Sequence, residues 1–424
     1  MKNYSILRIN GKFNNKMEGD LDDNVTRFSK QNYSENLTDF FESKCTYSDG
    51  FSRSFRSFGN EAIELIIDFE LLQKQWAKEN SLVYSENWMY EIMMAQIKNS
   101  MPDIVYIQSS TFSLPGLFKT ANPKDNLIKI IKDTFPFIKK VIIYSGYPST
   151  ADRIQGADLL FSSPPSILAD YKKKGLDPIL LYHSFDESIL QKMKVEKKYD
   201  FTFVGSSRAP ESRYWALRQL FEQTDLIAWV TEQKENKDEK TNNFNLKKRA
   251  RYVIKSASQL LTDQQINVLS GSNNIPFKIK KILKEISIER KFPATLLSEL
   301  YPERCFSSLV GMDMYNLLHQ SKITFNKHAD LRMGDVGNIR MFEATGVGTC
   351  LLTDTGNNIQ DLFEPDKEVV TYSCVDEAIE KTTYLLDHPD EAEQIAKAGQ
   401  ARTLKDHTIL NRCQQIDEVI QSKL

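Results

Sequence analysis

The chain has 424 residues, of which 41% are hydrophobic and 26% are charged, and its formal net charge is −2. This length predicts two or three domains, each able to bury its own core, and the composition is typical of a soluble globular protein. The near-neutral charge gives no general attraction to nucleic acid. No apolar run reaches the roughly 20 residues that span a bilayer.

The N-terminus and the cysteines indicate a cellular compartment. MKNYSILRING carries no signal-peptide pattern and leads directly into a predicted strand. The five cysteines are scattered without a CxxC pair, which favours reduced thiols over disulfides or a zinc site. We therefore expect a cytoplasmic protein.

In the N-terminal half, short β-branched runs alternate with helical patterns. The first expected strand is Ser5–Ile9, and EAIELIIDFELLQKQWAKE predicts a helix over Glu61–Glu79. The polar interval from Gly11 to Gly59 predicts a long loop with a short helix. Such alternation predicts a parallel sheet covered on both faces. Further strands are expected at Asp103–Gln108, Lys140–Tyr144, Ala157–Ser162 and Pro178–Tyr182, with helices at Asn126–Phe135 and Ser166–Lys174.

A second series of strands begins at Tyr199–Val204, after a charged segment, so we place a domain boundary near residue 190. A basic, helical stretch at Thr231–Tyr301 interrupts this series, and we interpret it as an insertion. The other expected elements are helices at Arg213–Glu222, Asp313–Gln320, Val375–Leu386, Pro389–Thr403 and Thr408–Lys423, and strands at Leu226–Val230, Lys322–Phe325, Thr349–Thr353 and Glu368–Tyr372.

The most informative stretch is Asn326–Asp354, which reads NKHADLRMGDVGNIRMFEATGVGTCLLTD. A buried strand leads into a polar loop, a glycine-bearing turn opens a short helix, and a second apolar strand follows. The free N–H groups at the start of such a helix favour an anion such as a phosphate. Carboxylates beside that site suit sugar hydroxyls.

The segments SKITFNKH, NIRMFEATGVGTCLLTD, DLFEPDKEVVTYS, DEAIEKTTYLLDHPDEAEQIAKAGQ and KDHT resemble the spore-maturation (CgeB-like) branch of the family-1-type and family-4-type glycosyltransferases. This resemblance implies an α/β protein of the GT-B fold, with two Rossmann-like domains facing across a cleft. Residues 1–190 would be the acceptor-side domain and 191–407 the nucleotide-sugar domain with the insertion 231–301. Residues 408–424 would form a helix crossing back to the first domain.

The turn after Tyr199–Val204 is one candidate part of the donor site. Gly205 and Ser206 let backbone approach a ligand, and Arg208 can hold a phosphate in bidentate fashion. Arg213 follows at a spacing where family-4 glycosyltransferases place a second cation against the donor diphosphate. The alternative is an ordinary βα turn with two solvated arginines.

The strand end and the helix start supply further candidates. Lys327 could neutralise phosphate, and His328 could hydrogen-bond phosphate or sugar, although histidines at strand ends often satisfy local polar groups. We expect the turn of Gly337 and Asn338 to receive the pyrophosphate, with Arg340 reinforcing it. Arg340 could instead pair with a neighbouring carboxylate.

Two carboxylates complete the set. Asp335 and Glu343 lie eight positions apart, and family-4 glycosyltransferases place two glutamates at this spacing. By that resemblance Glu343 binds the nucleotide ribose and Asp335 lies near the donor sugar, as does Thr355 after the next strand. We expect Asp335 and His328 to be the catalytic residues. The alternatives are that Asp335 caps a helix, Glu343 pairs with Arg340, and Thr355 belongs to a turn.

We therefore interpret the chain as a metal-independent and retaining glycosyltransferase that needs no cofactor beyond a UDP- or GDP-linked sugar donor. Its acceptor, a glycan, a lipid-linked molecule or a protein, is open. The basic segment 243–292 could contact the inner face of a membrane, or it could be a solvated helix face. The alternatives are a GT-B nucleotide-sugar epimerase and a non-catalytic binding protein with a decayed donor site.

Overall fold

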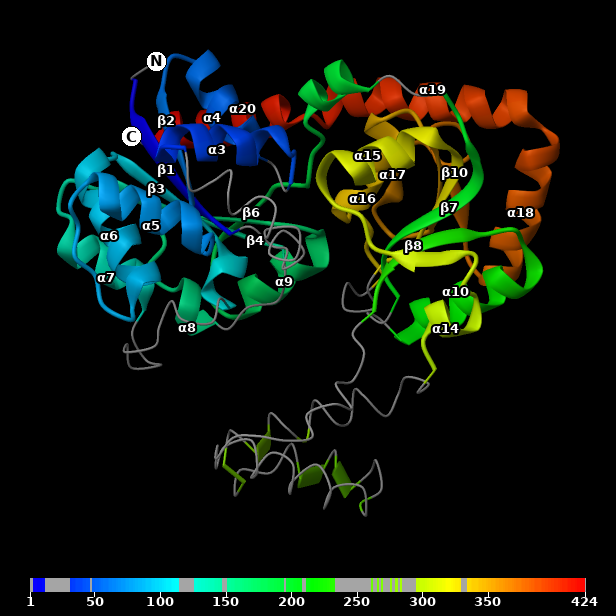
Figure 1. Cartoon of the computed structure of the whole chain (residues 1–424), viewed down its shortest axis with the longest axis horizontal. Helices are drawn as coiled ribbons and strands as arrows, with labels where there is room; N and C mark the ends of the chain where they lie inside the picture. The colour runs from blue at the N-terminus through cyan, green and yellow to red at the C-terminus, as the bar shows by residue number, and fades with distance from the viewer. Residues whose placement is uncertain are drawn as a thin grey trace. The chain divides into compact units, whose positions relative to one another are not determined.

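The computed structural model describes residues 3–11, 31–45, 48–113, 126–146, 151–193, 196–207, 211–232, 295–328 and 334–423, with isolated residues between 261 and 283. They form two six-stranded parallel sheets with flanking helices (Figure 1), as expected from the sequence. The chain divides into two compact units, Met1–Thr202 with Val310–Leu424, and Phe203–Leu309. The domain limits expected from the sequence divide the chain differently and stay a prediction.

The first sheet has the order β2-β1-β3-β4-β5-β6, and its strand pairs are parallel. Its strands are β1 Ser5–Asn10, β2 Glu61–Ile66, β3 Ile104–Gln108, β4 Lys140–Ser145, β5 Leu159–Ser162 and β6 Pro178–Leu180. The helices of this part are α3 Tyr33–Glu42, α4 Gly50–Ser57, α5 Glu70–Glu79, α6 Trp88–Ser100, α7 Leu127–Thr134, α8 Ala151–Ile154 and α9 Pro165–Lys173, with short 3₁₀ turns at Ser109–Ser113 and Glu187–Lys192.

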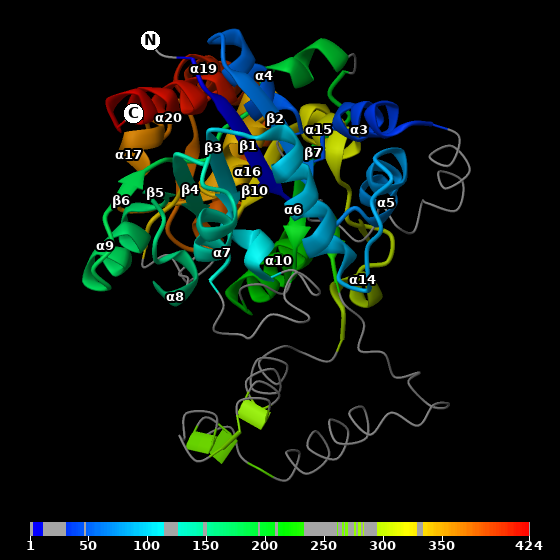
Figure 2. The ribbon, with the colours of Figure 1, turned by 90° about the vertical axis from the view of Figure 1, so that its left-hand side faces the viewer.

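Alternating side chains of the first sheet build two separate cores. Leu7 and Ile9 of β1 pack with residues of α6, α7 and α9 on one face. Ile6 belongs to the other core, which α4 and α20 (Ile409–Lys423) cover. The period of two along a strand explains this division. Both views show α20 beside α4 (Figures 1 and 2). The C-terminal helix α20 therefore packs on the first sheet.

The helix predicted over Glu61–Glu79 is wrong in its first third, because Glu61–Ile66 is strand β2 and only Glu70–Glu79 is helix. Glu64 is fully buried beside Arg8 of β1, its partner in the strand register, and Ser52 donates its backbone N–H to Glu64. In the sequence, Glu64 among apolar residues resembles the polar face of an amphipathic helix. In the structure it is a buried carboxylate paired with Arg8. The interval from Gly11 to Gly59 also holds two helices, α3 and α4, within its described residues.

The second sheet has the order β12-β11-β10-β7-β8-β9. Its strands are β7 Tyr199–Ser206, β8 Ile227–Thr231, β9 Cys305–Ser307, β10 Ser321–Asn326, β11 Cys350–Asp354 and β12 Val370–Tyr372. Strand β9 has three residues and was not expected from the sequence. The helices are α10 Glu211–Gln223, α14 Leu297–Leu300, α15 Gly311–Gln320, α16 Ile339–Gly346, α17 Ile359–Leu362, α18 Val375–Asp387 and α19 Pro389–Asp406.

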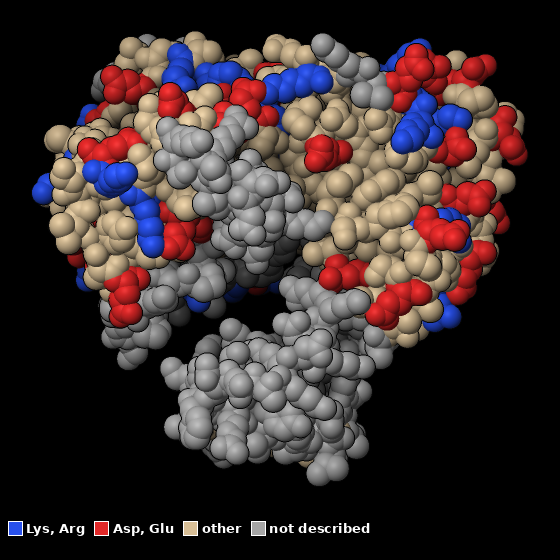
Figure 3. All heavy atoms as spheres, in the orientation of Figure 1, with Lys and Arg blue, Asp and Glu red and all other residues tan. Residues whose placement is uncertain are grey.

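Most of the expected insertion 231–301, including the basic residues 247–251, lies outside the described residues, so the membrane contact expected there stays a prediction. Among the helices that the structure describes, none has the length and apolarity to cross a membrane. Acidic and basic side chains are interspersed over the face shown in Figure 3.

Candidate active site

The N-terminus of α16 lies where strands β10 and β11 end, and its first turn is partly satisfied from within. The Asn338 side chain caps the helix by accepting the Met341 N–H at 3.2 Å. Over the described residues, the N–H groups of Ile339 and Arg340 have no hydrogen-bond partner. Two aligned donors at a helix start with a positive dipole favour an anion.

His328 holds the turn before this helix. Its Nε2 accepts the N–H of Gly337 at 3.0 Å and the N–H of Asn338 at 3.2 Å. Its Nδ1 donates to Asp354 Oδ1 at 2.6 Å, and its own backbone N–H donates to the same carboxylate. These contacts define a neutral imidazole protonated on Nδ1. Two of the N–H groups expected to meet the pyrophosphate are therefore bound by a histidine.

Asp354 is the acid that fixes this tautomer. Burial alone would raise the pKa of Asp354, but the hydrogen bonds from the side chain and backbone of His328 outweigh it, and its pKa lies below the usual value. Lys327, the neighbour of His328, adds to this lowering through its charge. Asp354 directly follows the strand expected at Thr349–Thr353, but only the fold shows that it faces His328.

Amide side chains hold the same turn in place. Asn338 Nδ2 donates to Asn326 Oδ1 at 2.9 Å, and Asn326 in turn donates to Thr353 Oγ1 at 3.0 Å. From the other side, Asn358 Oδ1 accepts the Val336 N–H at 2.8 Å, and Asn358 Nδ2 donates to the Val336 carbonyl. Gly337 has a φ of +119°, which favours glycine. The turn is preorganised.

Asp335 faces another helix instead of an open site. Its Oδ2 accepts the backbone N–H of Ser166, in the first turn of α9, at 2.7 Å, and its Oδ1 accepts from Asn357 Nδ2 at 3.3 Å. Only 7% of Asp335 is exposed. These contacts agree with the alternative that Asp335 caps a helix, but the helix that it caps is α9 and not α16.

Glu343 lies one turn into α16 and is buried. Its Oε1 accepts from the Tyr315 hydroxyl at 3.2 Å, and its Oε2 lies 2.8 Å from Arg340 Nη1. That ion pair lacks hydrogen-bond alignment, so Oε2 receives no hydrogen bond within the described part of the chain. The alternative pairing of Glu343 with Arg340 is thus present, and the Oε2 oxygen retains its capacity to accept a hydrogen bond. Tyr315 was not a candidate from the sequence, because its contact with Glu343 depends on the packing of α15 against α16.

The remaining candidates are less defined. Thr355 is exposed and its N–H donates to the Tyr372 carbonyl. Gly205 and Ser206 end β7, and Arg213 donates to the Ser206 carbonyl at 3.1 Å, in the unit Phe203–Leu309. Arg208 lies outside the described residues. The structure therefore brings together Lys327, His328, Asp335, Gly337, Asn338, Arg340, Glu343 and Thr355 around α16 and its flanking strands.

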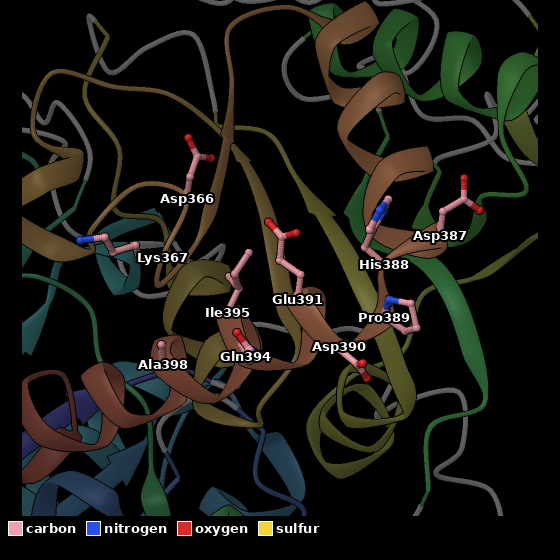
Figure 4. Close-up of a pocket in the computed structure, with 10 residues that line it drawn as sticks. All are labelled: Asp366, Lys367, Asp387, His388, Pro389, Asp390, Glu391, Gln394, Ile395 and Ala398. Carbon is pink, nitrogen blue, oxygen red and sulfur yellow. The ribbon is translucent and has the colours of Figure 1, made fainter.

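A hollow of about 770 Å³ lies elsewhere among the described residues. Its carboxylates come from the loop before β12 and from the corner between α18 and α19, and include Asp366, Asp387, Asp390 and Glu391 (Figure 4). Among the residues that the structure describes, no three His, Cys, Asp or Glu side chains are arranged to hold a metal. We assign this hollow no role.

Comparison with known proteins agrees with this geometry. Residues 279–418 match the model of a family described as glycosyl transferase-like, a range that contains α16 and both flanking strands. No curated protein sequence matches the chain significantly.

Solved structures share the fold over the whole chain. The sucrose-phosphate synthase of Thermosynechococcus elongatus superposes with a TM-score of 0.52 at 9% identity, over 99% of this chain and 98% of its own. The HepE protein of Anabaena, solved with UDP-glucose, gives a TM-score of 0.52 at 9% identity, over 99% and 100%. An alpha-glucosyltransferase, solved with UDP-glucose and DNA containing an abasic site, gives 0.53 at 10% identity, over 99% of both chains.

These findings support the enzyme class expected from the sequence, a glycosyltransferase. The chain has the GT-B fold of nucleotide-sugar-dependent glycosyltransferases, and its residues 279–418 are similar to a glycosyl transferase-like family.

Proposed function

We propose that the chain transfers a sugar from a nucleotide diphosphate to an acceptor, with the donor bound at the N-terminus of α16. The observation that carries this proposal is the pair of unpartnered N–H groups at Ile339 and Arg340, beside the buried Glu343 carboxylate with an oxygen that receives no hydrogen bond. The N–H groups can bind an anion, and the carboxylate beside them can accept hydrogen bonds from hydroxyl groups. Together they match a diphosphate joined to a ribose.

In this proposal each group has one task. The two N–H groups, the Arg340 guanidinium and the Lys327 ammonium stabilise the charge that develops on the leaving diphosphate. Glu343 accepts hydrogen bonds from the ribose. His328 and Asp354 act as positioning residues, because their contacts hold the turn of Gly337 and Asn338.

The finer assignments concern the donor nucleotide, the stereochemistry and the acceptor. A UDP-linked donor is favoured over a GDP-linked one because two structures of the same fold were solved with UDP-glucose. Retention of configuration rests on the resemblance to family-4 glycosyltransferases around Asp335 and Glu343, and independence of metal rests on the behaviour usual for the GT-B fold. Membership of the spore-maturation branch rests on the segments between Ser321 and Thr408 that resemble it. A glycan, lipid-linked or protein acceptor is compatible with the site, and peripheral contact with a membrane through 243–292 rests on the basic sequence alone.

Incubation with nucleotide-sugars tests the reaction. We expect transfer to an added acceptor, or slow hydrolysis of the donor to free sugar and nucleoside diphosphate, followed by chromatography. Interconversion of one nucleotide-sugar into another would instead establish the epimerase alternative. Binding without turnover, or no binding to UDP- and GDP-linked donors, would leave the non-catalytic alternative.

Glu343→Gln tests the donor site directly. If Glu343 binds the ribose, the variant should bind UDP more weakly by roughly 1.5–3 kcal/mol, the range for hydrogen bonds to charged groups, as measured by titration calorimetry. Glu364→Gln, at an exposed carboxylate paired with Lys367, is the matched control and should bind normally. Equal UDP affinity in a folded Glu343→Gln protein would reduce Glu343 to the partner of Arg340.

A further inference from the structure

A second cavity, of about 340 Å³, opens at the opposite end of β10 from the donor site. It lies where β10 begins, at Lys322 and Ile323, and where α16 ends, at Val347. Lys197, two residues before the start of β7, also lines the cavity. Residues of α18 and α19 form its remaining side. Its volume lies in the range of small-molecule sites, roughly 300–1,000 Å³. We name it the amino-end pocket.

The walls of the amino-end pocket are mainly apolar. Aliphatic side chains come from β10, α18, α19 and the turn after α16, namely Ile323, Val347, Leu385, Leu386, Ala392 and Ala396. Water bound against such walls finds few hydrogen-bond partners, so an apolar group displaces it favourably. The pocket therefore suits an aliphatic ligand of moderate size.

Its polar groups carry a positive excess. Lys322 Nζ lies 2.6 Å from Asp200 and Lys397 Nζ lies 2.5 Å from Glu393, so these two ammonium groups are neutralised. Among the described residues, no carboxylate forms an ion pair with Lys197. Its Nζ donates to the carbonyls of Ser321 at 2.8 Å and Gly348 at 3.0 Å.

Lys197 is therefore a fixed cation at the end of an apolar pocket. The residue as a whole is exposed, and two carbonyl groups fix the position of its ammonium. An ammonium has three N–H donors, so two carbonyls leave one donor for a ligand. Burial of this ammonium lowers the pKa of Lys197 to about 8, which indicates that a bound anion would compensate for lost solvation.

We propose that the amino-end pocket binds a small anionic amphiphile, an aliphatic chain ending in a carboxylate, with Lys197 receiving the anionic head. The apolar walls account for the chain, and the unneutralised ammonium accounts for the head. This site is separate from the donor site, because its lining includes Val347 and Gly348 just beyond the end of α16, whereas the donor site lies at the start of that helix.

Decanoate is the probe, and titration calorimetry on the full chain at pH 7 is the measurement. We expect one saturable site. Decanol, which keeps the chain without the charge, and inorganic phosphate, which keeps a charge without the chain, should both bind much more weakly. Decanol that binds as tightly as decanoate, or decanoate that shows no saturable binding, would overturn the proposal.

Two variants locate the site. Lys197→Met keeps the stem and should weaken decanoate binding about tenfold or more, as expected for loss of a charged hydrogen bond. Ala392→Phe fills the pocket and should abolish binding. The controls are Lys367→Met and Ala398→Phe, neither of which alters the amino-end pocket. Unchanged affinity in Lys197→Met, with its thermal unfolding unaltered, contradicts the proposal whatever the other variant does.

The pH dependence adds a readout that packing alone would not give. Lys197 is charged below pH 8, so decanoate affinity should fall as the pH rises through about 8, and Lys197→Met should remove that fall. The other titratable groups around the pocket are His319 of α15, Lys322 of β10, Cys350 of β11, and Glu393 and Lys397 of α19. An identical pH profile in Lys197→Met would assign the dependence to one of these groups and refute the role of Lys197.

Discussion

At the scale of single residues, His328 uses both ring nitrogens inside the protein. Nδ1 donates to Asp354 and Nε2 accepts two backbone N–H groups. A general base needs a lone pair that reaches the substrate, and here that lone pair is occupied. The catalytic role expected for His328 from the sequence thus competes with a role in holding the donor-binding turn.

His328→Ala separates these roles. Loss of the imidazole leaves two backbone N–H groups and Asp354 without their partner, so the free energy of unfolding should fall by about 1–3 kcal/mol, measured by urea denaturation. His388→Ala, at an exposed histidine stacked on Tyr384, should change stability little. A variant that loses transfer activity while keeping full stability would support the catalytic role.

His407 predicts how stability depends on pH. Its Nε2 donates to the Leu362 carbonyl at 2.9 Å, and its Nδ1 accepts from Arg412 at 2.7 Å. Burial, with the charges of Arg412 and Arg402, lowers the pKa of His407 to about 4. In the unfolded chain His407 gains a proton near pH 6.5, whereas in the folded chain it gains that proton only near pH 4. Stability should therefore fall as the pH drops between these values, by up to roughly 3 kcal/mol.

Denaturant titrations from pH 7 to pH 4 measure this contribution. His407→Gln removes the titrating group and should flatten the decline in that window, although the variant is less stable at pH 7. His388→Gln, at an exposed histidine, should keep the wild-type slope. An unchanged slope in His407→Gln would place the acid sensitivity in other groups.

At the scale of elements, α9 begins at a carboxylate supplied by the loop before α16. Asp335 accepts the Ser166 N–H in the first turn of α9, where a negative charge also favours the helix dipole. This contact couples the turn of the candidate donor site to a helix of the first sheet, within one compact unit.

Two substitutions at Asp335 separate capping from sugar contact. Asp335→Ala removes the acceptor and should lower stability by about 0.5–2 kcal/mol. Asp335→Asn keeps an oxygen acceptor, so it should retain most of that stability and bind UDP normally. If Asp335→Asn is stable but impaired in transfer, the carboxylate charge acts on the donor sugar, as the sequence predicts. Asn32→Ala, at the cap of α3, calibrates the cost of a lost cap.

The sequence predicted the elements whose polarity changes sharply at their ends. The pattern around Asn338 correctly placed strand, turn, helix and strand, because the buried apolar runs of β10 and β11 flank a polar loop. It failed at Glu61–Ile66, where Glu64 is neutralised across the sheet by Arg8. The sequence also could not show that Asp335 accepts a hydrogen bond from Ser166 or that His328 pairs with Asp354. Both pairings depend on tertiary packing between segments far apart in sequence.

At the scale of the whole molecule, the first sheet depends on a helix distant in sequence. Ile409, Cys413, Ile416 and Ile420 of α20 belong to the core on one face of that sheet. Arg412 fixes the entry of α20 by donating to the carbonyls of Tyr182 and His183.

Truncation after His407 should therefore unfold the unit that contains both segments. Four buried side chains at about 1.5–3 kcal/mol each exceed or match the marginal stability of most proteins. We expect loss of cooperative thermal unfolding and binding of an apolar dye. Removal of only Ser422–Leu424, beyond the last buried residue of α20, should be tolerated. A truncated protein that unfolds cooperatively near the wild-type temperature would contradict this dependence.

The position of α20 also affects folding during synthesis. The ribosome completes β6 at Leu180, but the helix that covers one face of its sheet begins at Ile409, 229 positions later. At about 5–20 residues per second, that delay is roughly 10–50 s. The nascent chain must keep Ile6, Phe55 and Tyr106 from aggregating throughout this time. The demand on chaperones should therefore peak on the ribosome, before α20 emerges.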